Sequence, residues 1–146
     1  MEDKIIQQFY DLRKKVTYDT REFEVKDLCH LYHSNKLYLS LPTGNTTLYS
    51  KIIECMLLGY PNKRLNVIAD FSDLTSSILK TNSEQIRALI TFVDNKFKLI
   101  NLSYLTELNS FYFKELPDSI QNKILNNFIR VIVVSGNFSE EYFNFN

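Results

Sequence analysis

The amino-acid sequence predicts a domain of the α+β class, a mixed α/β fold in which a small mixed sheet is flanked by about four to five helices. Apolar residues recur at helical spacing in several segments, and short alternating or β-branched segments lie between them. Apolar residues make up 45% and charged residues 23% of the chain, which excludes general disorder. A length of 146 residues is enough to bury roughly two-thirds of the unfolded surface, so we expect a single domain over residues 1–146.

The N-terminal part of the chain begins with an amphipathic pattern that predicts a helix over residues 2–16. A polar stretch over residues 17–21 follows, and we treat residues 1–21 as an N-terminal helical extension. The segment VKDLCHLYHSN, residues 25–35, predicts a short helix that ends at its last residue, and the alternation in residues 36–41 predicts a strand.

In the middle of the chain, an apolar stripe predicts a helix over residues 46–58, with Gly59 at the position where helices often end. Residues 64–71 form a second expected strand. The segment 72–81 is compatible with a third strand or with a short helix. Another amphipathic helix follows over EQIRALITFVDN, with Asn82 or Ser83 as its N-cap.

The last part of the chain contains a loop-rich stretch over residues 101–116 and then a helix opened by Pro117 and Asp118. This helix carries apolar residues up to Phe128. The β-branched run over residues 129–134 is the best candidate for a buried strand, and residues 136–146 form a polar tail with four aromatic residues.

Charge and composition exclude several classes of function. The chain has 17 Lys and Arg against 17 Asp and Glu, with a pI near 6.7. Electrostatic binders of nucleic acid or membranes usually carry a basic excess, so the charge disfavours DNA and argues against a membrane partner. Only 3 glycines are present, too few for the Gly-rich phosphate cradles of common nucleotide-binding folds.

Two cysteines, Cys29 and Cys55, do not make a disulfide framework in a chain of this size and favour a reducing, cytoplasmic location. The N-terminus is acidic and then amphipathic, unlike a secretory signal. The longest apolar stretches, residues 52–58 and 129–134, are shorter than the roughly 20 residues of a membrane span.

Four segments resemble one known family. They are IIECMLLGYP, RALITFVDNKFKL, LTELNSFYFKELPDSIQNKILNNFIRVIVV and VKDLCHLYHSNKLYLSLP. The last of these comes first along the chain, and in chain order the four are similar to the N-terminal ParB/sulfiredoxin-like nucleotidase domain of GmrSD-type modification-dependent restriction enzymes. The resemblance covers roughly residues 22–135 and implies a ParB/sulfiredoxin-like core over that range.

The departures from the family concern its catalytic apparatus. The family's Asp-Gly-x-Gln-Arg motif falls on residues 81–85 of this chain, which read TNSEQ, and a shift of one position matches only Gln85. The carboxylate that would bind a metal or act as a base is lost, as is the guanidinium fork that would hold phosphate. A second hallmark, a Gln-Arg pair expected near residues 41–49, is missing too, and the length leaves no room for the family's HNH-like nuclease domain. The resemblance therefore implies no catalytic residue and no cofactor.

Other constellations point only weakly to chemistry. Asp70, Glu84 and Gln85 are the candidates for a residual nucleotide site with Mg²⁺, although such acids more often cap helices or face solvent. Cys29 and His33 share a helix face, but zinc needs four ligands, so we predict no metal site. The segment PTGNTT, residues 42–47, lacks the Lys of a phosphate loop and favours a turn with Thr46 or Thr47 capping the next helix.

Two aromatic groups are candidates for binding a protein partner, since exposed rings are common interface anchors. Three consecutive aromatic residues cannot all point one way, so we expect one or two of the first group to face outward; packing of the tail onto the core is the competing explanation for the second. The groups are Phe111, Tyr112 and Phe113, and Tyr142, Phe143 and Phe145.

These observations predict a non-enzymatic protein-binding module derived from a restriction-type nucleotidase domain. The resemblance places it in phage–host conflict, as an inhibitor such as an anti-CRISPR or anti-restriction factor, or as a regulatory subunit of a defence system. Its partner is then a protein component of a defence system or of a phage. The alternative is a nucleotide-binding or nucleotide-hydrolysing subunit, or a subunit that senses modified DNA, in a GmrSD-like restriction system.

Overall fold

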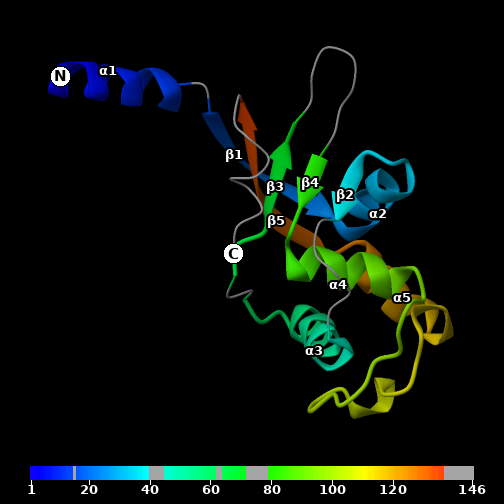
Figure 1. Cartoon of the computed structure of the whole chain (residues 1–146). Helices are drawn as coiled ribbons and strands as arrows, with labels where there is room; N and C mark the ends of the chain where they lie inside the picture. Colours follow the sequence, from blue (N-terminus) through cyan, green and yellow to red (C-terminus); the bar gives the residue numbers. More distant parts are fainter. Residues whose placement is uncertain (15, 40–44, 62–63, 72–78, 137–146) are drawn as a thin grey trace.

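The structure is a computed structural model of the 146-residue chain and describes residues 1–14, 16–39, 45–61, 64–71 and 79–136 (Figure 1). Helices and strands alternate along these residues, and the expected α+β class is confirmed. The elements are α1 (Glu2–Arg13), β1 (Val16–Glu24), α2 (Val25–His33), β2 (Leu37–Leu39), α3 (Thr46–Leu57), β3 (Val67–Asp70), β4 (Leu79–Thr81), α4 (Glu84–Val93), the 3₁₀ turns η1 (Thr106–Leu108) and η2 (Phe113–Glu115), α5 (Asp118–Leu125) and β5 (Phe128–Gly136).

The strands form one mixed sheet in the order β1-β5-β3-β4-β2. The β5 strand pairs antiparallel with β1, from Val16 opposite Gly136 to Glu24 opposite Phe128, and parallel with β3 on its other side. The β3–β4 pair is antiparallel and the β4–β2 pair is parallel. The long β5 strand therefore joins the N-terminal strand to the strands from the middle of the chain.

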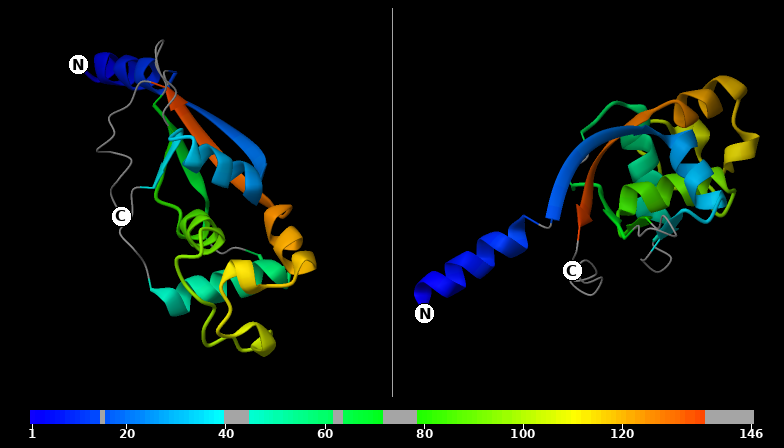
Figure 2. Two further views of the ribbon diagram at one scale, coloured as in Figure 1. Left: turned by 90° about the vertical axis from the view of Figure 1, so that its right-hand side faces the viewer. Right: turned by 90° about the horizontal axis from the view of Figure 1, so that it is seen from above.

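One face of the sheet carries the core. Along β5, Ile129, Val131 and Val133 are buried, whereas Phe128 and Arg130 on the opposite face are exposed. Helices α2 to α5 gather on one side of the sheet, and α1 alone projects away from it (Figures 1 and 2). The α4 helix supplies Ile86, Leu89, Ile90 and Phe92, all fully buried, so this helix lies at the centre of the core.

The structure identifies the N-cap residues of two helices, one that the sequence left open between two residues and one that the sequence predicted wrongly. Ser83 is the N-cap of α4, because its hydroxyl accepts a hydrogen bond from the backbone N–H of Ile86 at 3.2 Å. The cap of α3 is Asn45 and not Thr46 or Thr47 as expected. The Asn45 Oδ1 accepts from the backbone N–H groups of Thr47 and Leu48 at 2.8 and 3.3 Å.

The largest difference from the sequence prediction is β1. The expected helix over residues 2–16 ends at Arg13, and residues 17–21, expected to be a polar connection, are part of a nine-residue strand. The boundary placed at residue 21 therefore falls inside β1. This strand lies at the edge of the sheet and exposes most of its residues, so it lacks the apolar alternation of a half-buried strand.

A smaller difference concerns Phe128. The sequence placed it on the last helix, but α5 ends at Leu125 and Phe128 begins β5 with an exposed side chain. Between α5 and β5, the Asn127 carbonyl accepts from the backbone N–H of Val25 at 3.0 Å. The end of α5 is thereby joined to the start of α2.

A carboxylate on α3 holds the loop that precedes η1. Glu54 is only 4% exposed, and its side chain accepts hydrogen bonds from the backbone N–H groups of Ser103, Tyr104 and Leu105 at 3.4, 2.9 and 2.9 Å. Burial opposes ionisation of Glu54. The three N–H donors and the nearby Lys51 outweigh that effect, so the pKa of Glu54 is lowered from its ordinary value.

We expect Glu54→Gln to destabilise the fold by about 1–3 kcal/mol at neutral pH. The glutamine amide has one acceptor oxygen, whereas the two carboxylate oxygens of Glu54 now share the hydrogen bonds from three backbone N–H groups. The lowered pKa gives the sign of the pH dependence. The wild-type advantage is present above the ordinary glutamate pKa of about 4.3 and is lost as the pH falls through the lowered value. Urea unfolding at neutral and acid pH measures the difference.

Glu107→Gln is the matched control, because Glu107 is an exposed carboxylate on η1. It should leave the unfolding free energy within about 0.5 kcal/mol of wild type at both pH values. Equal effects of the two substitutions would contradict a role for Glu54 in holding the loop.

Candidate functional site

A groove of about 300 Å³ lies between α3, the residues that lead into β3, and the start of α4. Its apolar wall comes from α3 and from the chain on either side of residues 62–63, which are not described. Its polar floor comes from the residues before β3 and at the start of α4. The wall includes Leu48, Ile52, Met56, Tyr60 and Leu65, and the floor includes Asn66, Ser83, Glu84 and Gln85.

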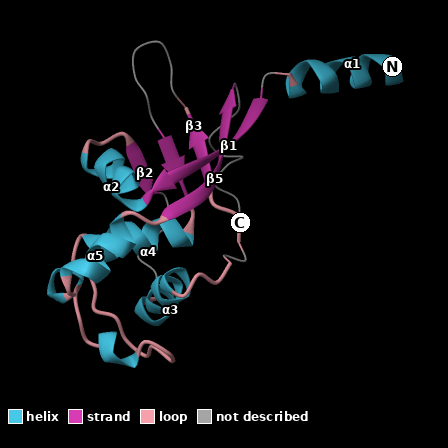
Figure 3. Ribbon diagram, turned by 180° about the vertical axis from the view of Figure 1, so that it is seen from behind, coloured by secondary structure: helices cyan, strands magenta, loops and turns pink. Residues whose placement is uncertain are grey.

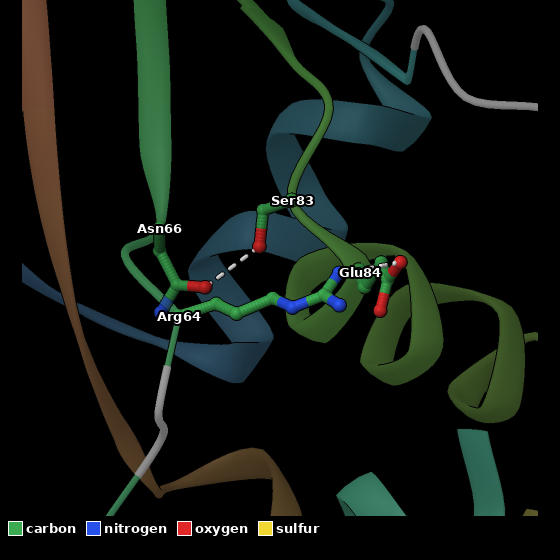
Figure 4. Close-up of polar contacts among 4 residues, drawn as sticks. All are labelled: Arg64, Asn66, Ser83 and Glu84. Atoms are coloured by element: carbon green, nitrogen blue, oxygen red, sulfur yellow. Dashed lines mark hydrogen bonds and ion pairs between the residues drawn. The ribbon is translucent and has the colours of Figure 1, made fainter. Parts of the chain in front are cut away.

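Asn66 organises the floor of this groove and is only 6% exposed (Figure 4). Its Oδ1 accepts a hydrogen bond from the Ser83 hydroxyl at 2.7 Å. Its Nδ2 donates to Gln85 Oε1 at 2.7 Å and to the Arg130 carbonyl at 3.2 Å. One buried amide thus joins the start of β3, the start of α4 and β5.

Thr81 and Ser83 complete this network. The Thr81 hydroxyl donates to the Val67 carbonyl at 2.7 Å and accepts from the backbone N–H of Ser83 at 3.0 Å. Both residues are buried. Residues 81–85 are the positions that the family resemblance assigns to phosphate handling. In this chain Thr81, Ser83 and Gln85 direct their side chains into hydrogen bonds with neighbouring elements.

Glu84 lies on the open side of the groove, where Arg64 Nη1 donates to its Oε1 at 3.0 Å (Figure 4). This ion pair is exposed at its Arg64 end, so it contributes at most about 1 kcal/mol to stability. Its main effect is electrostatic, because the guanidinium of Arg64 and the carboxylate of Glu84 neutralise each other at the open side of the groove.

Asp70 does not join Glu84 and Gln85. Ile68 pairs with Thr81 in antiparallel strands, so Asp70 lies along β3 in one direction while Glu84 follows β4 in the other. The two carboxylates therefore belong to opposite ends of this strand pair. Among the described residues no group of three or more His, Cys, Asp or Glu side chains is placed to hold a metal ion.

Cys29 and His33 lie on α2, which contributes no residue to the groove. Cys29 is a buried free thiol, and burial together with the charge of Asp94 raises its pKa to about 12. It is therefore protonated at neutral pH and is neither a nucleophile nor a ready metal ligand. His33 Nε2 lies 2.7 Å from Asp94 Oδ1, and this contact joins α2 to the end of α4.

The first aromatic group divides between surface and core. Phe113 is 6% exposed and packs edge-to-face on Phe92 with ring centroids 5.8 Å apart, so it belongs to the core. Phe111 is exposed, and the Tyr112 ring has Lys98 Nζ 5.6 Å from its centroid. Tyr142, Phe143 and Phe145 lie outside the described residues.

The sequence prediction missed the groove itself. Leu65 is 75% exposed, although it lies in an apolar segment that we expected to be strand from residue 64. Tyr60 is also exposed and packs edge-to-face on Tyr104 at 6.4 Å. One available signal was Asn66, the polar residue set into the apolar segment RLNVIADF.

The described residues that line the groove offer contact surface and hydrogen bonds more than reaction chemistry. They include the exposed thiol of Cys55 but no histidine, since both histidines lie on α2. The Glu84 carboxylate is held by Arg64 and the Ser83 hydroxyl by Asn66. A nucleophile activated by a neighbouring base, the usual basis of covalent catalysis, is not assembled by these groups.

Comparisons with known proteins identify no relative. No family model, no curated protein and no solved structure matches the chain. Membership of the ParB/sulfiredoxin-like family therefore stays a prediction from the four sequence segments. In the described part of the chain, none of the helices has the length and apolar character needed to span a membrane.

We expect Asn66→Asp to destabilise the fold by about 2–4 kcal/mol, because it removes two donors and places a carboxylate against the Arg130 carbonyl. Chemical denaturation at neutral pH measures the loss. Asn122→Asp makes the same chemical change on the exposed face of α5 and should stay within about 0.5 kcal/mol of wild type. A variant Asn66→Asp as stable as Asn122→Asp would show that the network does not hold the three elements together.

Proposed function

We propose that this chain is a non-enzymatic protein-binding module that contacts its partner through the groove beside α3. One observation carries the proposal. At the positions where the family's catalytic motif would fall, Ser83 and Gln85 hydrogen-bond to the buried side chain of Asn66, and the exposed side chains of Tyr60 and Leu65 line the same groove. A partner that binds such a surface would bury exposed apolar area next to polar side chains that are already held in place by hydrogen bonds.

The bordering surface extends beyond the first groove. A second hollow of about 580 Å³ runs along β5 and shares Tyr60, Arg64, Leu65 and Asn66 with the first. The exposed side chain of Phe128 also lines this hollow. Interfaces concentrate their binding energy in aromatic and large apolar anchors surrounded by polar residues, which matches this arrangement.

The charges of this surface also favour a protein partner. The two hollows are lined by the cations Lys51, Arg64 and Arg130 and by the carboxylates Glu22 and Glu84, and ion pairs join Arg64 to Glu84 and Arg130 to Glu22. A nucleic-acid site would concentrate positive charge instead. The family resemblance supplies the class of partner that we propose, a protein component of a phage or of a restriction-type defence system, toward which the chain acts as an inhibitor or as a regulatory subunit.

Affinity capture with the full chain from host and phage-infected lysates tests the proposal. We expect a stoichiometric partner that wild type and Tyr38→Ala retain and that Leu65→Asp loses by at least about tenfold, since a charge in an apolar contact costs more than about 1.4 kcal/mol. Tyr38 is an exposed aromatic residue on β2 and serves as the control.

Absence of any partner, or a partner that Leu65→Asp retains, would contradict the proposal that the groove is the binding site. Loss on Phe111→Ala or Tyr112→Ala with Leu65→Asp still active would move the contact to the loop before η2.

Nucleotide binding is the alternative function, with Asp70, Glu84 and Gln85 as its residues. We expect a flat calorimetric titration of each common nucleoside triphosphate with Mg²⁺ at roughly millimolar concentration, which corresponds to a binding free energy weaker than about −4 kcal/mol. A binding isotherm that Asp70→Asn or Glu84→Gln abolishes would establish the alternative instead. Modified-DNA sensing is tested by a titration with modified DNA at several salt concentrations. Binding whose affinity falls steeply as salt is added would support that function.

A further inference from the structure

The α1 helix has no buried side chain and extends from the start of β1 away from the rest of the molecule (Figures 1 and 3). A helix of this length is marginal in water by itself, and an amphipathic face usually needs a packing partner. The large apolar side chains of α1 are each 46–59% exposed, and they are Ile5, Ile6, Phe9, Tyr10 and Leu12.

These side chains form a stripe with opposite charges at its two ends. At 3.6 residues per turn, Ile5, Ile6, Phe9 and Leu12 lie on one face of α1. Glu2 falls on the same face at the N-terminal end and Arg13 at the C-terminal end. The opposite face carries the polar residues Lys4, Gln7, Gln8 and Asp11.

We propose that α1 pairs antiparallel with α1 of a second copy of this chain and makes a homodimer. In that orientation Glu2 of each copy faces Arg13 of the other, and Ile6 of each lies against Phe9 of the other. A two-fold axis makes both ends equivalent, as in most homodimers. In a parallel pair Glu2 would face Glu2, and like charges would oppose association.

The position of α1 also favours the antiparallel pair. The C-terminal end of each α1 leads into its own β1, so antiparallel helices place the two sheets at opposite ends of a stem about 18 Å long. A hollow of about 290 Å³ lies where α1 meets β1, lined by Phe9, Leu12, Arg13, Val16 and Tyr18. The N-terminal end of the second copy arrives at this hollow, where its Met1 side chain, 95% exposed in one copy, can be covered.

Charge argues against a membrane surface as the occupant. Helices that lie in a membrane interface carry Lys and Arg on the polar face, whereas the polar face of α1 includes Asp11 and a single cation, Lys4. The stripe supplies roughly 100 Å² from each of its half-exposed side chains. That sum is below the roughly 800 Å² per partner of a stable interface, so the dimer forms reversibly with concentration.

Sedimentation equilibrium of the full chain over roughly 5–500 µM tests the proposal. We expect the mass to rise from 17.2 kDa toward twice that value. Phe9→Glu should weaken association by at least about tenfold. Gln8→Glu adds the same charge on the polar face and should leave association unchanged. Because α1 buries nothing in the core, both variants keep the wild-type unfolding midpoint.

A charge exchange tests the orientation. Glu2→Lys and Arg13→Glu each place like charges together and should weaken self-association, whereas an equimolar mixture of the two variants should associate as a heterodimer. A parallel pair already sets like charges together in the wild type, so it predicts that neither variant alone weakens self-association. A mass of 17.2 kDa at every concentration, unchanged association of Phe9→Glu, or no association in the mixture would overturn the proposal.

Two further results separate this inference from others. Binding of the monomer to vesicles of phosphatidylcholine and phosphatidylserine would overturn it in favour of a membrane. The inference does not rest on the groove, because α1 contributes no residue to it. Phe9→Glu should therefore still capture the groove's partner, and Leu65→Asp should still dimerise, so either proposal can fail while the other stands.

Discussion

The buried side chain of Asn66 is the interaction on which the arrangement of the sheet and its central helix depends. Its amide reaches Ser83 and Gln85 at the start of α4 and the Arg130 carbonyl of β5, while the backbone carbonyl of Asn66 accepts from the backbone N–H of Ile132 at 2.8 Å. A side-chain amide has two N–H donors and one acceptor oxygen. It can therefore donate to Gln85 and to the Arg130 carbonyl while it accepts from the Ser83 hydroxyl. Apolar residues at this position would leave those groups buried without partners.

The same network limits what the groove can do. Ser83 caps α4 and donates to Asn66, so its hydroxyl is committed at both its donor and an acceptor position. Positions that would handle phosphate in the family that the chain resembles are therefore part of the scaffold. The groove's remaining chemistry is its apolar border, headed by Tyr60 and Leu65, and its exposed pair of Arg64 and Glu84. This combination is suited to recognition, and it supports the proposal of binding without catalysis.

The sequence predicted the elements that face the core and the short edge strand β2, and it missed the other edge strand, β1. The α4 helix was predicted with its Ser83 cap as one of two alternatives, because its buried face repeats at helical spacing. The β1 strand was missed since an edge strand exposed along most of its length has no apolar alternation, although it pairs with β5 over nine residues. The groove was missed for another reason. Leu65 reads as a core residue in sequence, and only the pairing of β3 with β5 from Val67 onward leaves it outside the sheet.

The α1 helix shows the limit of periodicity from the other direction. Its pattern predicted a helix correctly up to Arg13, but the same stripe that would mark a core helix packs here on nothing within the described part of the chain. Periodicity identifies a face that needs cover and does not say whether the cover belongs to the same molecule. What distinguishes α1 is the charge at the ends of the stripe. Glu2 and Arg13 are of opposite sign and lie at either end of one face, so the surface is complementary to itself when it is turned around.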